Sequence, residues 1–194
     1  MTRFVDRGAV AAAYVGIGMA LTIVASFTLI IPIESFISLL ALPAGLLIGY
    51  YANQRSNRRA GPWSRIALNG LFAGVVTALT LAAFVLVIKA IFFFADTGYP
   101  DFNRVDAQNQ PIPPFCQTGA DCVFQRYVAA GRGGDLAALG ITDSGPFTGF
   151  YWAEQASSAA STVLLTTVGA IAGAGLYGVF RPKPAEEERA VRAT

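Results

Sequence analysis

Four long apolar stretches, separated by polar segments, dominate the pattern along this chain. The first is residues 8–31, which contain no charge, and the others are residues 35–52, 66–94 and 156–180. At about 1.5 Å of rise per residue, the first stretch reaches about 36 Å as a helix, enough to cross a hydrocarbon core of about 30 Å. The pattern therefore predicts an all-α integral membrane protein with four transmembrane helices.

The first stretch has to be distinguished from a cleaved signal peptide, because Arg3 and Arg7 precede it. The apolar core of a signal peptide has about 7–15 residues, whereas this stretch is longer and continues past the small residues Ala25 and Ser26. We therefore expect an uncleaved first span. In the second stretch, Pro43 predicts a kink, because a buried proline removes one helical hydrogen bond.

Basic residues collect on one side of the predicted membrane. Ten of the 14 lysines and arginines lie in the N-terminus, the loop between the second and third spans, and the tail 181–194. Because positively charged segments stay in the cytoplasm, both termini are predicted to be cytoplasmic. The high ratio of arginine to lysine, with abundant alanine and glycine, is typical of a GC-rich bacterial genome, so the expected location is the plasma (inner) membrane.

The orientation divides the chain into a membrane part and a large outer segment. Residues 1–95 carry the first three spans, and residues 96–155 form the extracytoplasmic loop before the fourth. Loops of this length rarely lack structure, so we expect a small folded cap or a segment ordered by a partner. Within it, Asp121 and Asp135 mark the starts of two short helices, over 121–130 and 135–139.

Both cysteines, Cys116 and Cys122, fall in this predicted outer segment. Because the outer compartment is oxidising, we expect them to form a structural disulfide. The alternative is a redox-active thiol pair, which would make the chain an extracytoplasmic thiol-redox protein.

Small residues recur at helical spacing in all four spans. They permit close backbone approach between helices, either inside one bundle or against another subunit. The helix-packing candidates are Gly16 and Ala20 in the first span, Gly45 and Gly49 in the second, Gly70 and Gly74 in the third, and Ser158, Thr162, Thr166, Gly169 and Gly173 in the fourth.

Composition excludes several classes of chemistry. The chain has no histidine, which excludes histidine-ligated haem and imidazole catalysis and argues against most zinc and copper sites. The middle of each span has no ionisable residue: Asn69 lies near one end of the third span, and Lys89, near the other, is expected to reach the headgroups. We expect no catalytic residue, no metal site, no cofactor and no nucleic-acid partner.

The short basic loop between the second and third spans contains Arg55, Arg58 and Arg59. These arginines are candidates for binding anionic lipid headgroups, although the orientation rule by itself also explains arginines at this place.

These features favour a non-catalytic accessory or scaffold subunit of a larger, possibly energy-transducing, membrane complex, with lipids and other membrane subunits as its partners. The alternative is a small oligomeric transporter or channel with a pore lined by Ser158, Thr162 and Thr166. An extracytoplasmic thiol-redox protein is the third hypothesis.

Overall fold

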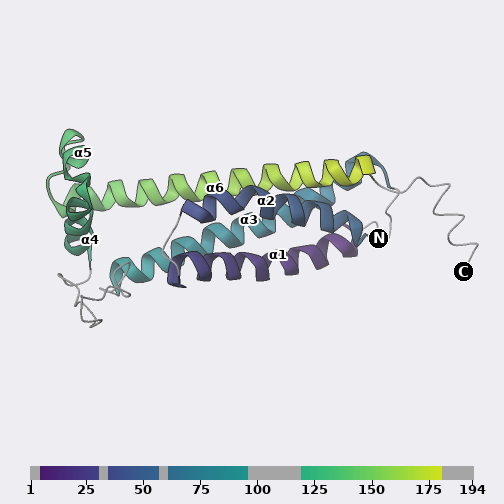
Figure 1. The fold of residues 1–194 in the computed structure, drawn as a ribbon, viewed down its shortest axis with the longest axis horizontal. Coiled ribbons are helices and arrows are strands. Elements are labelled where there is room, and N and C mark those ends of the chain that lie inside the picture. Colours follow the sequence, from purple (N-terminus) through teal and green to yellow (C-terminus); the bar gives the residue numbers. More distant parts are fainter. Residues whose placement is uncertain (1–4, 31–34, 57–60, 96–118, 181–194) are drawn as a thin grey trace, which may run out of the picture. The chain divides into compact units, whose positions relative to one another are not determined.

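The computed structural model describes residues 5–30, 35–56, 61–95 and 119–180, so the tail 181–194 lies outside the described residues. Every regular element in these ranges is a helix (Figure 1). Four helical stretches are long and apolar enough to cross a membrane, which confirms the predicted all-helical, four-span class. They are α1 (Arg7–Ala25) with its π-helical continuation η1 (Ser26–Ile30), α2 (Ser35–Gln54), α3 (Trp63–Phe94) and α6 (Ser144–Phe180). The sidedness of the termini stays a prediction.

The fourth membrane helix begins at Ser144, well before the predicted start at residue 156. The backbone N–H of Gly145 donates a hydrogen bond to the Asp143 carboxylate (2.9 Å), which caps the helix. Pro146 follows in the first turn, where its missing N–H leaves no hydrogen bond unmade. Glycines and polar residues interrupt the apolar pattern between this start signal and residue 156, so a search for an unbroken apolar stretch does not find it.

The chain divides into two compact units. The first contains α1, α2, α3 as far as Phe84, and α6 from Ala160. The second contains the remainder of α3 and α6 with the small elements α4 (Ala120–Tyr127), η3 (Val128–Arg132) and α5 (Gly133–Ala138). Gly131 breaks the helix between α4 and α5 with a φ of 88°, a conformation that glycine adopts without strain. The two predicted short helices correspond to α4 and α5.

In the first unit, four of the predicted packing glycines bring α2 and α6 into direct backbone contact. A Cβ atom added to any of them would overlap a carbonyl oxygen of the facing helix: Gly45 meets Thr166, Gly49 meets Ala170, Gly169 meets Leu42 and Gly173 meets Leu46. Residue numbers rise together along this contact, so the two helices run parallel. Because no side chain fits between the backbones, only glycine permits this approach.

The other predicted packing residues connect α3 to α6 and α1 to α3. Gly70 and Gly74 of α3 face the side chains of Ala174 and Ala170. Gly16 of α1 faces the hydroxyl-bearing side chain of Thr77 on α3, and Ala20 is fully buried. The three helices with two glycines four residues apart, α2, α3 and α6, therefore use their small faces inside the chain.

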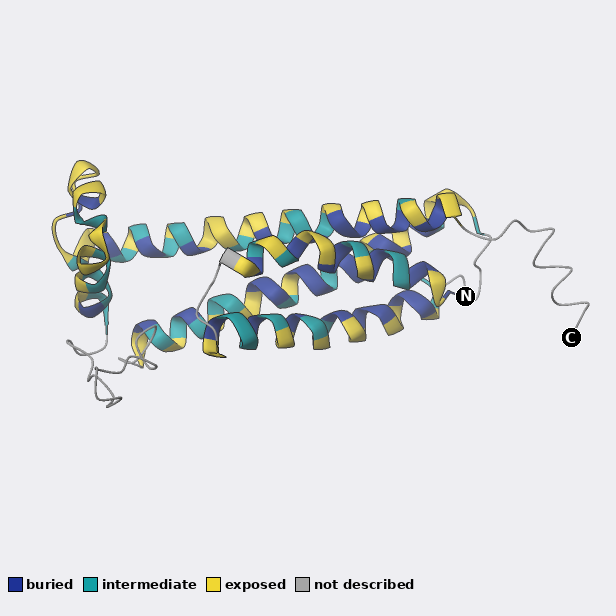
Figure 2. Cartoon of the chain, in the orientation of Figure 1, coloured by how far each residue is buried: buried dark blue, intermediate teal, exposed yellow. Residues whose placement is uncertain are grey.

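Buried and exposed positions alternate along the helices of the first unit (Figure 2). Most of the buried hydrophobic residues there are small, whereas many large apolar residues are exposed, as expected for a membrane bundle. One buried cluster consists of alanines and a single isoleucine: Ala9, Ala12, Ile48, Ala52 and Ala73. Large leucines such as Leu39, Leu47 and Leu79 are instead more than half exposed. Lipid tails solvate such side chains as well as a protein core does, so packing between backbones holds the helices together.

Gly49→Ala is expected to destabilise the bundle by about 1–3 kcal/mol, because its Cβ would overlap the backbone of Ala170. The measurement is the midpoint of thermal unfolding in detergent. Gly18→Ala is the matched control, since nothing lies within 4 Å of that position and alanine favours helices more than glycine does. Equal midpoints for both variants would contradict the packing described for α2 and α6.

Candidate functional site

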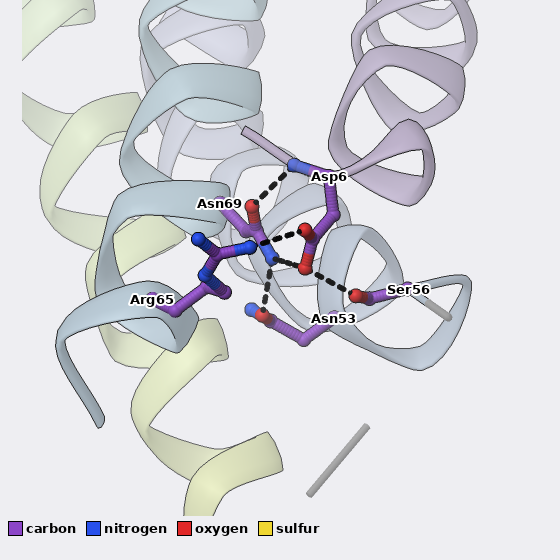
Figure 3. A network of polar contacts seen from close by, with 5 residues as sticks. All are labelled: Asp6, Asn53, Ser56, Arg65 and Asn69. Atoms are coloured by element: carbon purple, nitrogen blue, oxygen red, sulfur yellow. Dashed lines mark hydrogen bonds and ion pairs between the residues drawn. The ribbon is translucent and has the colours of Figure 1, made fainter. Parts of the chain in front are cut away.

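A network of polar side chains lies at the end of the first unit where α1 begins, α2 ends and α3 begins (Figure 3). We call it the Asp6 cluster; its members are Asp6, Asn53, Ser56, Arg65 and Asn69. Two of these residues are noticeable in the sequence: Asn69 near the end of the third span, and Arg65 among the basic residues of the loop before it. The signal for the others is weaker, since polar residues beside the end of an apolar stretch are common.

The Asp6 carboxylate is the centre of this network. Its Oδ1 accepts a hydrogen bond from Arg65 (2.9 Å), and its Oδ2 accepts bonds from the Ser56 hydroxyl (2.6 Å) and the Asn69 amide (3.1 Å). The backbone N–H of Asp6 donates to the Asn69 side-chain oxygen (3.1 Å). The side chains of Asp6 and Arg65 are 10% and 24% exposed, so this ion pair is largely shielded from solvent.

Opposing effects act on the pKa of Asp6. Burial raises it, whereas hydrogen bonds from Ser56 and Asn69 lower it, as does the neighbouring guanidinium. The lowering effects together are larger, so the pKa lies below its ordinary value of 3.8. Asp6 is therefore a stable anion at neutral pH.

The two asparagines of the cluster connect the end of α2 to the start of α3. Each is only 1% exposed. The Asn53 amide donates to the backbone carbonyls of Gly49 and Ile66 (both 3.1 Å), and its oxygen accepts a bond from the Asn69 amide (3.4 Å). Buried amides that have all their donors and acceptors matched stabilise one arrangement of the backbone. This part of the cluster fixes the end of the bundle.

A second polar group lies in the second unit, around Glu154 of α6. We call it the Glu154 cluster; its other members are Tyr127 and Arg132. Arg132 contacts both carboxylate oxygens (2.9 and 3.3 Å), and the Tyr127 hydroxyl donates to Oε2 (2.9 Å). The Arg132 guanidinium also lies 4.7 Å from the centre of the Tyr127 ring, a cation–π contact.

Electrostatics keep the members of the Glu154 cluster in defined charge states. Burial and the adjacent negative charge of Glu154 raise the pKa of Tyr127, and the hydrogen bond to Glu154 raises the pKa of Arg132. Lys89 also attracts the Glu154 carboxylate. Lys89 is only 7% exposed. The expectation that it reaches the headgroups is therefore wrong, because the early start of α6 provides a helical carboxylate beside it.

Aromatic side chains form the interior of the second unit. Phe147 is fully buried, and its ring lies 5.4 Å from Phe124 and 5.0 Å from Tyr127, both edge to face. Phe93 packs against Tyr151 at 4.9 Å. Leu136 and Ile141 belong to the same cluster and attach α5 to it. The second unit therefore has a hydrophobic cluster to which α3, α5 and α6 all contribute, while a folded cap over residues 96–155 stays a prediction.

The candidate pore residues do not share one environment. Thr162 and Thr166 of α6 are buried in the first unit, whereas Ser158 is exposed. The other buried threonines bond to their own helices, since Thr77 donates to the Ala73 carbonyl at 2.9 Å. A pore lined by these three residues stays a prediction.

Several predicted site residues fall partly or wholly outside the described ranges. Cys122 is buried in α4, but Cys116 lies outside, so the disulfide stays a prediction. Arg55 is exposed at the end of α2, while Arg58 and Arg59 lie outside the described residues.

The geometry of both clusters favours a structural function over reaction chemistry. Each central carboxylate, of Asp6 and of Glu154, accepts three hydrogen bonds, one or two of them from an arginine. A carboxylate held in this way is a poor proton acceptor, because its charged form is the stabilised one. Within the four described ranges, no group of three or more acidic or cysteine side chains is arranged to hold a metal ion.

The lowered pKa of Asp6 predicts acid sensitivity. The carboxyl binds a proton more readily in the unfolded chain, so its contribution to stability is complete above pH 3.8 and is lost as the pH falls through the lower folded pKa. Asp6→Asn should flatten the loss of stability in this range and lower stability at pH 7 by about 1–3 kcal/mol, because an amide cannot accept from three donors. Thermal unfolding against pH is the measurement. The control is Asp121→Asn, which removes an exposed carboxylate. It should change neither the stability at pH 7 nor the loss of stability as the pH falls.

The aromatic interior predicts that Phe147 matters more to the second unit than the Glu154 ion pair does. Phe147→Ala should cost about 3–5 kcal/mol and speed amide hydrogen exchange in α4 and α5. Arg132→Gln should cost under about 1 kcal/mol, since both partners of the ion pair are more than one third exposed. Faster exchange in the Arg132 variant than in the Phe147 variant would reverse this ranking.

Comparison with known proteins adds no relative to this picture. No known protein family, curated protein or solved structure matches the chain.

Proposed function

We propose that this chain is a non-catalytic accessory or scaffold subunit of a larger membrane complex. The observation that carries the proposal is an exposed apolar strip on the C-terminal turns of α3. Val87, Ile91 and Phe94 follow one face of the helix at spacings of four and three residues, and they are 53%, 52% and 66% exposed. The position of this strip, rather than its exposure alone, points to a protein partner.

The apolar part of α3 is longer than a bilayer requires. Residues 66–94 extend about 43 Å as a helix, and only a tilt of about 45° would enclose that length in a hydrocarbon core of about 30 Å. Transmembrane helices tilt by about 0–40°. Some apolar turns of α3 therefore extend past the hydrocarbon core, where lipid tails no longer cover them. A partner subunit packed on the strip would remove this surface from water.

The described interior supports a structural subunit over a transporter. The contact between α2 and α6 is closed by backbone atoms, with no side chain between the helices along Gly45 and Gly49. The carboxylates of Asp6 and Glu154 are neutralised within the chain. The packing glycines do not themselves argue for a partner, because α2, α3 and α6 use them against one another.

The test is to isolate the chain with mild detergent from its native membrane and measure the mass of the intact particle. We expect a hetero-oligomer of fixed stoichiometry. A photoreactive residue at position Ile91 should crosslink to the co-purified subunit, whereas one at Leu79, a mid-span residue that is 56% exposed, should crosslink to lipid only.

A polar variant gives an independent check of the same surface. Val87→Ser combined with Ile91→Ser should abolish co-purification and leave thermal unfolding of the isolated chain within about 1 kcal/mol of the wild type, since exposed side chains contribute little to its fold. A monomer in mild detergent would contradict the proposal. An oligomer made only of this chain would favour the transporter or channel instead.

A further inference from the structure

We propose that Arg7 and Arg55 form a binding site for the phosphate of an anionic phospholipid headgroup, at the end of the bundle that carries the Asp6 cluster. This inference depends on the chain lying in a membrane, and it is independent of the proposed partner subunit. Three observations support it. Asp6 neutralises Arg65 but neither Arg7 nor Arg55, the first turn of α1 lies against the end of α2, and Tyr51 holds the Arg55 side chain.

The Asp6 cluster neutralises only one of the three described arginines at this end. Arg65 is paired with Asp6 at 2.9 Å. The Asp6 carboxylate is paired with Arg65 and accepts its other two hydrogen bonds from Ser56 and Asn69, so none of its contacts involves Arg7, its neighbour in sequence. Arg7 and Arg55 are both exposed, and within the described residues neither is in an ion pair. Two positive charges are thus available to an external anion.

Gly8 brings these two arginines together. A Cβ atom added to Gly8 would overlap the backbone between Arg55 and Ser56, so the first turn of α1 lies directly against the end of α2. The Ser56 hydroxyl, which donates to the Asp6 carboxylate at 2.6 Å, holds the two segments in this arrangement. The residue that follows Arg7 thus lies against the backbone of Arg55, although 48 residues separate the two arginines in the sequence.

The Arg55 side chain is held in a fixed orientation. Its Nε donates to the Tyr51 hydroxyl (3.1 Å), and its guanidinium lies 5.8 Å from the centre of the Tyr51 ring. The two terminal nitrogens then remain for a ligand, and a guanidinium presents them in the fork geometry that suits two phosphate oxygens. Because part of the side-chain entropy is already lost, binding an anion costs less than it would for a mobile arginine.

Aromatic residues place this pair at headgroup depth. Tyr51 lies in the last turn of α2, and Trp63, half exposed, begins α3. Trp and Tyr concentrate at the boundary between hydrocarbon and water. Arginines at this depth meet lipid phosphates, and each contributes to attraction toward anionic lipid. A headgroup with a net negative charge is therefore the ligand that fits.

The test titrates the full-length chain in mild detergent with phosphatidylglycerol or phosphatidylcholine and counts bound lipid by native mass spectrometry. Arg7→Gln combined with Arg55→Gln should weaken phosphatidylglycerol binding about tenfold or more and leave phosphatidylcholine binding unchanged. Arg58→Gln combined with Arg59→Gln removes the same number of positive charges, from the loop that follows Arg55, and should leave phosphatidylglycerol affinity unchanged. Arg7→Lys combined with Arg55→Lys should bind phosphatidylglycerol more tightly than the glutamine double variant and more weakly than the wild type. Lysine keeps the positive charge but lacks the two-nitrogen fork of a guanidinium.

Four results would overturn the site. Wild-type affinity in the Arg7 and Arg55 double variant would exclude it, and an equal loss in the control pair would indicate diffuse attraction. Displacement of phosphatidylglycerol by an equal concentration of inorganic phosphate would assign a free-phosphate site instead. Lipid binding that appears only after Glu186, Glu187 and Glu188 are changed to glutamine would assign the arginines to the acidic tail. Unchanged thermal unfolding of each variant in detergent confirms that the fold is intact.

Discussion

The direct backbone contact between α2 and α6 is the constraint on which the first unit depends. Two parallel helices meet where four glycines leave no room for any side chain, and α3 then packs its own glycines against the same face of α6. In a membrane, lipid tails compete equally for apolar side chains, so a helix pair gains most from close van der Waals contact between backbones. This explains why alanine and glycine are buried while the leucines face outward.

That packing also places the Asp6 cluster at one end of the bundle. Because α2 and α3 are held together by their contacts with α6, the end of α2 and the start of α3 meet at a fixed distance, and Asn53 and Asn69 can complete each other's hydrogen bonds. Asp6 then attaches the start of α1 to both. The Asp6 cluster forms because the bundle brings together three helix ends: the start of α1, the end of α2 and the start of α3. The cluster in turn fixes the segments that carry Arg7 and Arg55.

Sequence reasoning predicted the helical spans because their length and lack of charge are properties of each segment by itself. The four spans follow from apolar stretches, and the helical pairing of Gly45 with Gly49 or Gly169 with Gly173 is visible in the spacing. The Asp6 cluster cannot be predicted from the sequence, because its members come from three separate segments and no local pattern shows which residues pair with which. The start of α6 is missed for another reason: Asp143 and Pro146 signal a helix, but glycines and polar residues interrupt the apolar pattern in the turns that follow. Lys89 was misjudged as a consequence, since Glu154 was assigned to a loop.

The structure also distinguishes basic residues near the Asp6 cluster that the sequence treats alike. The orientation rule counts arginines and gives little weight to acids, so Arg7, Arg55 and Arg65 count equally in the sequence. In the folded chain they differ, because Arg65 is held by Asp6 while Arg55 is held only by a neutral hydroxyl. An arginine that helps to orient a chain during insertion can therefore serve afterwards as a structural ion pair, and another from the same loop can keep its charge for the lipid surface. The distinction rests on one carboxylate, which lies against Arg65 and, in the part of the chain that the structure describes, forms no ion pair with Arg7 or Arg55.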